Sequence, residues 1–329
     1  MAFMVTGLTM RMIACVLLAG VVVGCGGPDA KNGADANGVD LDGDAYVLLP
    51  SEPMVLGVLD AKSLYESKSI ASQVARIVER FVPIGEESGF VAARDVDRIV
   101  VGMYSTQGAD AAAIVRGRFD EAKIAQAAAQ HTMTKAGGAL SSSTYAGRNV
   151  YSVAVGSVVG GFVVLTSKTV LAGTESGIRR TLDRVRDGKA TKRGMPQWMV
   201  DTVETKGAEL AFAADFSTQP VASAAIRGLP ITFLNGMRMA RVLGDFKEPG
   251  MHIAATTTYG DATQANAAAE QLKLVDGWGR ALGAVLTFIP KLQNLDVTTD
   301  DKDVRAKAAI DEQALHKLLE LLPGLIAHS

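Results

Sequence analysis

The stretch NVYSVAVGSVVGGFVVLTSKTVLAG, residues 149–173, decides the fold class of this chain. It contains three runs rich in branched apolar residues, 149–155, 161–166 and 170–173, separated by short connections. Gly156-Ser157 suits a two-residue hairpin turn, because glycine accepts the backbone angles that such turns require. Strands joined by hairpin-length turns pair antiparallel, since a parallel pair needs a much longer crossover. The stretch therefore predicts neighbouring antiparallel strands.

The apolar part of this stretch, Val153 to Thr166, has a second interpretation as a membrane-inserting segment. It spans 14 residues and is interrupted by three glycines and a serine. A transmembrane helix needs about 20 predominantly apolar residues. Strands of a buried core are therefore the preferred interpretation.

Strands and amphipathic helices alternate on the N-terminal side of this stretch. Val55 to Leu59 reads as a strand that ends at Asp60, which is a good N-cap for a helix. The apolar stripe of that helix has helical spacing and consists of Ile70, Val74, Ile77, Val78 and Phe81. Strands are also expected over 99–104 and 112–119, with Gly108 in the turn, and helices over 120–135 and 175–186.

A similar order returns after a polar connector at 188–196. Residues 210–214 form a strand-like run that ends at Asp215, and helical material is expected to follow to about Leu243. Residues 253–259 then lead into a helix capped near Asp261, and two strands at 295–299 and 304–310 precede a last helix capped by Asp311. An internal duplication of an α+β unit is favoured over an unrepeated α+β fold.

These patterns predict an α+β protein with antiparallel sheets, helices packed on one face, and two similar halves at 45–190 and 197–329. Val304 to Ala308 and Val115 to Phe119 alternate apolar with charged or small residues, which predicts sheet faces open to water. The globular part resembles uncharacterised secreted bacterial α+β proteins with a duplicated unit. No activity is implied by that resemblance.

The N-terminus carries a targeting pattern. Arg11 and an apolar run from Met12 to Gly24 have the layout of a signal peptide. The run ends in Val22-Val23-Gly24-Cys25, which resembles the lipobox of bacterial lipoproteins. The resemblance implies that residues 1–24 are a lipoprotein signal peptide, cleaved between Gly24 and Cys25, and that acyl chains on Cys25 hold the protein in a membrane; an ordinary secretory signal is the alternative.

Residues 25–44 are rich in Gly, Asp, Asn and Ala and are expected to be a flexible tether. Gly26 is not the aspartate that retains enterobacterial lipoproteins in the inner membrane, so the resemblance favours the outer membrane, with the protein facing the periplasm. Within the tether, Asp40-Leu41-Asp42-Gly43-Asp44 is similar to the start of a calcium loop. The twelfth position of such a loop would be Ser51 rather than glutamate, so a solvated acidic linker is the preferred interpretation.

Composition excludes several classes of function. Removing residues 1–24 takes only Arg11 from the charged residues, which leaves 32 Lys+Arg against 35 Asp+Glu, a formal balance of −3. Such a balance gives no drive towards nucleic acid. Cys15 lies in the signal peptide and Cys25 would be acylated, so no disulfide is expected. The four histidines, His131, His252, His316 and His328, lack the spacing of a zinc site. No metal ligand, cofactor-binding residue or catalytic residue is predicted.

A basic cluster is the one candidate contact for an anionic partner. It consists of Arg179, Arg180, Arg184, Arg186, Lys189, Lys192 and Arg193. Several cations close together attract an anionic lipid headgroup or an acidic envelope protein. A solvated helix end whose cations favour the C-terminal dipole is the alternative.

The leading functional hypothesis is a lipid-anchored, non-enzymatic protein of the cell envelope that binds or scaffolds a partner. A carrier or sensor of a small or lipidic ligand, in a cleft between the two halves, is the second hypothesis. An envelope hydrolase is the third.

Overall fold

The computed structural model describes residues 38–68, 70–81, 90–105, 110–130, 140–155, 158–219, 224–226, 229–248, 250–282 and 292–316. The predicted signal peptide, the lipobox and residues 25–37 of the predicted tether lie outside the described residues. The same holds for Gly108, His131, Gly156-Ser157 and His328.

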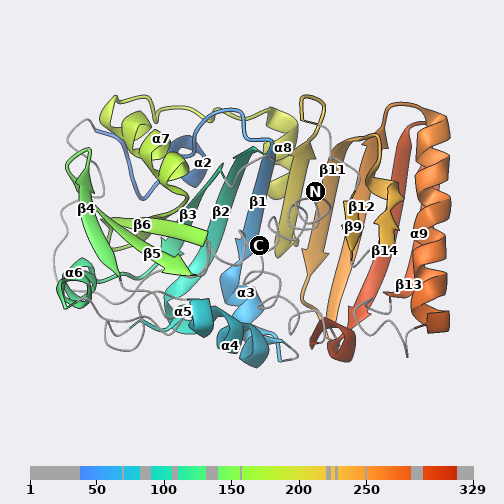
Figure 1. Cartoon of the computed structure of the whole chain (residues 1–329), viewed down its shortest axis with the longest axis horizontal. Helices are drawn as coiled ribbons and strands as arrows, with labels where there is room; N and C mark the ends of the chain where they lie inside the picture. Colours follow the sequence, from blue (N-terminus) through green and yellow to red (C-terminus); the bar gives the residue numbers. More distant parts are fainter. Residues whose placement is uncertain are drawn as a thin grey trace.

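One twelve-stranded sheet forms the body of the protein, and every pair of neighbouring strands in it is antiparallel (Figure 1). The first half supplies β1 (Val55–Asp60), β2 (Val96–Ser105), β3 (Asp110–Gly117), β4 (Ser141–Tyr145), β5 (Arg148–Val155), β6 (Val158–Thr166) and β7 (Thr169–Gly173). The second half supplies β8 (Leu210–Asp215), β11 (Met237–Asp245), β12 (Gly250–Tyr259), β13 (Leu292–Asp300) and β14 (Asp303–Asp311). A separate pair consists of β9 (Ala224–Ile226) and β10 (Leu229–Ile231).

The predicted hairpin stretch forms β5, β6 and β7, and its antiparallel pairing is confirmed. Val155 pairs with Val158, so two residues connect β5 to β6. Val153, Phe162, Val163 and Val164 are buried. The segment from Val153 to Thr166 therefore forms strands of the core, which confirms the preferred interpretation.

The strand order repeats from the centre of the sheet outwards. It is β1-β2-β3-β7-β6 in the first half, with β5 and β4 added, and β8-β11-β12-β14-β13 in the second half. The central strands β1 and β8 pair with each other, and Gly57 lies opposite Phe212. A Cβ atom at Gly57 would lie 2.8 Å from the Phe212 ring, so the close approach requires glycine. The predicted antiparallel α+β fold is confirmed, and its two similar halves share one sheet.

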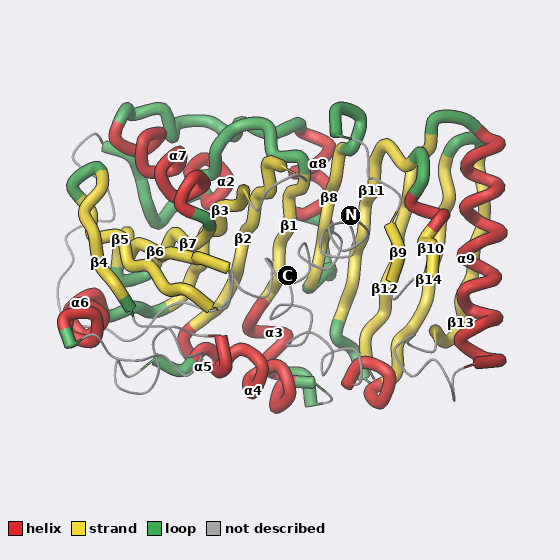
Figure 2. Tube along the Cα trace, viewed as in Figure 1, coloured by secondary structure: helices red, strands yellow, loops and turns green. Residues whose placement is uncertain are grey.

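Helices lie over both faces of the sheet, which refines the expectation of one covered face (Figure 2). We call face A the side that carries Leu56, Val58, Val100 and Ile114, and face B the side that carries Leu59, Ile99, Val101 and Val115. Face A contacts α2 (Ala45–Leu48), α7 (Glu175–Arg186) and α8 (Gln197–Val203). Face B is covered by α3 (Ala61–Glu66), α4 (Ala71–Phe81), α5 (Ala92–Asp95) and α6 (Glu121–Ala129) in the first half and by α9 (Ala262–Leu282) in the second.

Most predicted caps are confirmed. Asp60 accepts a hydrogen bond from the Ser63 amide, Asp120 from the Ala122 and Lys123 amides, and Asp311 from the Ala314 amide. The expectation of one helix after Asp60 is wrong, because the chain becomes extended at Ser67 (φ −66, ψ 122) and α4 starts again at Ala71.

Two further sequence expectations are corrected. The helical material expected between Asp215 and Leu243 contains strands instead, because β11 fills the place between β8 and β12. The last residues of the predicted tether, 39–44, belong to the folded body rather than to a free linker. Val39 and Leu41 are only 5% and 2% exposed and pack against face A of the first half.

Candidate functional site

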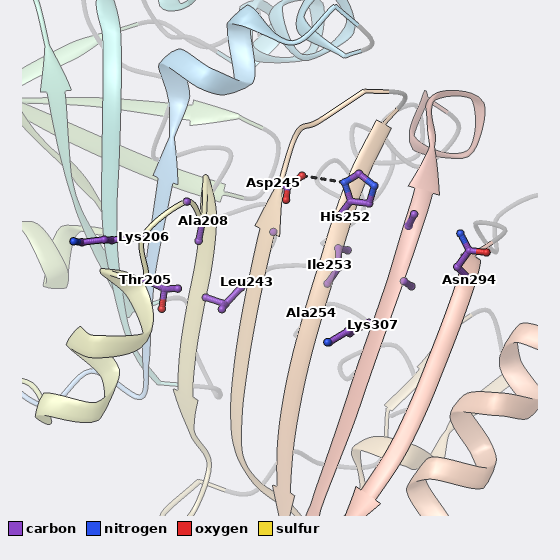
Figure 3. Close-up of a pocket in the computed structure, with 14 residues that line it drawn as sticks. Thr205, Lys206, Ala208, Leu243, Asp245, His252, Ile253, Ala254, Asn294 and Lys307 are labelled. Carbon is purple, nitrogen blue, oxygen red and sulfur yellow. Dashed lines mark hydrogen bonds and ion pairs between the residues drawn. The ribbon is translucent and has the colours of Figure 1, made fainter.

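Among the described residues, the second half has one helix on face A, α8, and a groove runs along the boundary of the area that α8 does not cover. Helix α8 buries Met199, Val200 and Val203 against the central strands, and the turn that follows it, Thr205 to Ala208, overhangs β11. The hollow between this turn and β11, β12 and β14 has a volume of about 450 Å³ (Figure 3). A second hollow of about 370 Å³ continues it, because both are lined by Thr205, Leu243 and Ala254. We call the two together the α8 groove.

A carboxylate–imidazole pair lies at one end of the α8 groove. The Nδ1 atom of His252 is 3.0 Å from Oδ1 of Asp245. These two residues face each other because Asp245 of β11 pairs with His252 of β12. Lys247 adds a backbone hydrogen bond of 3.2 Å and an ion pair of 3.4 Å to the same carboxylate. Partial burial raises the pKa of Asp245, but the hydrogen bonds from His252 and Lys247 outweigh it and hold the pKa below its ordinary value.

The floor of the groove consists of small residues, and its polar groups stand around them. Gly207, Ala208, Gly244, Ala254, Ala308 and Ala309 line the larger hollow. Lys307 lies next to Ala254 on the neighbouring strand and reaches over this floor, with Asn294 beyond it on β13 (Figure 3). Small side chains leave the strand backbones accessible, so the floor can receive an extended chain.

The other end of the groove is aromatic and charged. The guanidinium of Arg241 lies 5.3 Å from the ring centroid of Trp198, which is a cation–π contact. Asp201, Thr202 and Thr256 complete this end. The charged residues of the groove are Arg241 and Lys307 and the carboxylates Asp201 and Asp245. Lys206 also belongs to the lining, but its side chain points away from the groove (Figure 3), and Asp296 pairs with Lys307 on β13.

The predicted basic cluster does not form one free cationic surface. Five of its seven residues have a carboxylate partner: Arg179 pairs with Glu175, Arg180 with Asp110, Arg186 with Asp183 and Asp187, Lys189 with Asp187, and Arg193 with Asp44 and Glu204. Lys192 is exposed. Contact between this cluster and an anionic partner stays a prediction.

Arg184 from the same cluster has a structural role. Its guanidinium donates hydrogen bonds to the Val47 carbonyl (2.9 Å), the Ser51 hydroxyl (3.2 Å) and the Lys192 carbonyl (2.7 Å). Burial lowers the pKa of Arg184. The side chain therefore ties α7 to the segment before β1 and to the connector after α7.

The acidic loop at 40–44 surrounds an arginine rather than a solvent-exposed space. Arg116 donates to the carbonyls of Leu41 and Gly43, at 2.7 Å each, and lies 3.7 Å from the Asp42 carboxylate. Asp42 also accepts a hydrogen bond from Thr169 at 2.6 Å. Two interpretations are thereby corrected: the loop is not a solvated linker, and Arg116 does not lie on a face open to water.

The alternation at Val304 to Ala308 does mark an open face, as predicted. Val304 is buried, whereas Arg305 and Lys307 are exposed on face A.

Of the histidines, His252 lies in the groove and His316 lies 3.9 Å from Glu312. Within the described ranges, no group of three or more His, Cys, Asp and Glu residues is arranged to hold a metal ion.

The α8 groove was not predicted from the sequence, although the sequence contains one signal for the groove. The exposed alternation in β14 showed that a sheet face lies open, but α8 was not predicted and the connector before it carries no motif. The pairing of Asp245 with His252 depends on the register of β11 against β12, which only the folded chain reveals.

In the part of the chain that the structure describes, no helix combines the length and the apolar character needed to cross a bilayer.

No protein-family model and no curated protein matches the sequence. The fold does match solved structures of TP0453. Crystal form III gives a TM-score of 0.52 at 9% identity, covering 84% of this chain and 97% of that one; form I gives 0.52 at 10%, covering 85% and 97%. The chain thus shares the fold of TP0453.

Proposed function

We propose that this chain is a lipid-anchored, non-enzymatic binding protein of the bacterial cell envelope that faces the periplasm and holds an extended, acidic segment of a partner protein in the α8 groove. The main observation in support of a binding function is the groove itself. It combines a floor of small residues with two cations on its rim, Arg241 and Lys307. The lipobox-like sequence at Cys25 supports the location.

The shape of the groove favours an extended peptide over a compact ligand. The groove follows β11 and β12 from Arg241–Thr256 at one end to Asp245–His252 at the other, a length of about four residues or roughly 13 Å of strand. An extended segment of that length places one carboxylate near Lys307 and another near Arg241. Its backbone can contact the small residues between them.

The groove lies wholly within the second half, since all its lining residues follow residue 197. This supports a partner that docks on one half over a ligand held between the halves. The lining contains a carboxylate–imidazole pair and three threonines but no serine or cysteine. This composition supports binding rather than nucleophilic hydrolysis.

A charge reversal in the groove tests the binding site. The probe is a fluorescein-labelled hexapeptide of alternating glutamate and threonine, titrated by anisotropy against the full chain and compared with its lysine–threonine counterpart. Lys307→Glu is expected to weaken binding of the acidic probe at least tenfold, or about 1.4 kcal/mol. Lys302→Glu is the matched control, because it makes the same charge change in the β13–β14 turn, outside the groove.

Equal binding by Lys307→Glu and Lys302→Glu would contradict the groove as the site, and equal binding of both peptides would contradict an acidic partner.

The anchor is tested separately by Cys25→Ser. This variant should remain an uncleaved precursor or leave the membrane fraction, because the serine oxygen does not receive the thioether-linked lipid. Normal maturation and unchanged sedimentation with the outer membrane would overturn the lipoprotein assignment.

A further inference from the structure

The two edges of the sheet differ in how they are protected against pairing with another strand. At one edge, β13 carries exposed Asp296 and Asp300, and its register against β14 is irregular between Gln293 and Asp296. Asn294 has a positive φ of 53° at that irregularity, and α9 packs against the same strand (Figure 2). Charges, bulges and covering helices are the usual devices that prevent edge-to-edge association.

Strand β4 at the opposite edge carries no charged residue and no irregularity of register, and α6 contacts it. Ser141, Ser142, Ser143 and Thr144 are exposed, uncharged and in unbroken register with β5. Figure 1 shows β4 as the last strand of the sheet, with α7 near one end and α6 near the other. An uncharged, regular edge strand of this kind is a template for strand addition.

The hairpin turn decides which backbone groups of β4 are available. Ala146 and Gly147 have φ values of 49° and 75°, which is the pattern of a two-residue type I′ turn. The pair Tyr145–Arg148 that flanks such a turn exchanges both backbone hydrogen bonds, and hydrogen-bonded pairs then alternate along the ladder. The N–H and C=O groups of Ser142 and Thr144 therefore point away from β5.

We propose that β4 is a self-association site, at which a second copy of this chain pairs antiparallel with its own β4 about a two-fold axis at Ser143. In this register, Ser142 of each copy faces Thr144 of the other, so all outward backbone groups of the strand are used, in about four hydrogen bonds. Registers centred on Ser142 or Thr144 leave some of them unpaired. The pairing brings together no charges of the strand, since residues 141–144 carry none.

Self-pairing fits this edge better than pairing with the other edge of the same chain. A β4–β13 contact would place the uncharged β4 against the acidic and irregular β13, and repeated contacts of that kind would form an open filament. The β4–β4 contact is isologous and closes after two copies. It is independent of the α8 groove, which lies in the other half of the sheet.

Disulfide trapping tests the register. Two copies of Ser143→Cys would place their Cα atoms about 4.5 Å apart in a non-hydrogen-bonded pair, which is within the range of about 4.4–6.8 Å for a disulfide. Two copies of Ser141→Cys, the matched control, would lie about 13 Å apart along the strands. Both variants retain Cys15 and Cys25, so cross-linking through native thiols is common to both.

On mild oxidation of the full chain, Ser143→Cys should form covalent dimers at least about tenfold faster than Ser141→Cys. Sedimentation velocity of the unmodified chain should show a reversible dimer, and Ser143→Lys should weaken it at least tenfold, because two ammonium groups then meet at the axis. Equal cross-linking rates, a monomer at about 100 µM, or an unchanged dimer in Ser143→Lys would each overturn the proposal.

Discussion

Face A of the two halves is built on the same strand order but carries different side chains. In the first half, a row of cross-strand neighbours is apolar and at most 5% exposed; it consists of Val58, Val100, Ile114, Leu171 and Val163. In the second half, the row that starts from Ala213 is otherwise polar; it consists of Ala213, Arg241, Thr256, Arg305 and Thr298. Arg241, Arg305 and Thr298 are exposed, and Thr256 is partly exposed.

The difference shows that topology and coverage are decided separately. The strand ladder needs only backbone pairing and one buried face, and face B provides that face in both halves. Whether helices also cover face A depends on its side chains. The first half is covered by α2 and α7, whereas among the described residues of the second half α8 is the one helix on face A, where it contacts β1, β8 and β11.

The largest expected effect comes from truncating equivalent positions in the two rows. Leu171→Ala should lower the free energy of unfolding by about 2–5 kcal/mol, because it leaves a cavity in a fully buried row. Arg305→Ala should change it by less than about 0.5 kcal/mol, because Arg305 is exposed and its ion pair with Asp300 lies in water. Equilibrium denaturation in urea measures both values. Similar losses in the two variants would show that face A of the second half is covered in solution.

The next largest effect sharpens the comparison by using two cations on the same face. Arg116→Ala should cost about 1–3 kcal/mol, because it leaves the Leu41 and Gly43 carbonyls without this donor and removes the ion pair with Asp42. It should also make the 38–44 segment more sensitive to limited proteolysis. Lys307→Ala is the control, because its side chain is exposed. Equal protease sensitivity of the two variants would mean that Arg116 does not hold the segment.

The smallest expected effect concerns the open face in acid. The pKa of Asp245 is lower in the folded chain than its ordinary value of 3.8, so the folded state binds fewer protons than the unfolded state between the two values. The resulting stabilisation is present above about pH 3.8 and is lost as pH falls through the lowered pKa.

Asp245→Asn should therefore flatten the acid part of the stability curve by less than about 1 kcal/mol. His252→Gln should flatten it only in part, because the bonds from Lys247 remain. Unfolding free energies measured at a series of pH values check both variants. A curve for Asp245→Asn that is as steep as that of the unmodified chain would show that this carboxylate does not contribute to the acid dependence of stability.

The sequence predicted the local structure where it depends on nearby residues. The β5–β6–β7 stretch, the caps at Asp60, Asp261 and Asp311, and the helix over 175–186 were all predicted correctly, because turn length, capping oxygens and apolar spacing act within a few residues. The lipobox at Cys25 is equally local, although the described residues do not include it. The repeated strand order was also indicated by two runs that end in Asp60 and Asp215.

Only the tertiary structure decided which residues meet across the chain. The Arg116 side chain meets the loop at 41–43, and Asp245 meets His252, because of strand register and of packing between segments distant in sequence. Alternation of apolar and charged residues has the same form at Val115–Phe119 and at Val304–Ala308, yet one arginine is enclosed and the other is exposed. The sequence by itself determined the period of each strand, because side-chain alternation is a property of the strand alone. The fold decided what covers each face, because coverage depends on segments that the alternation does not contain.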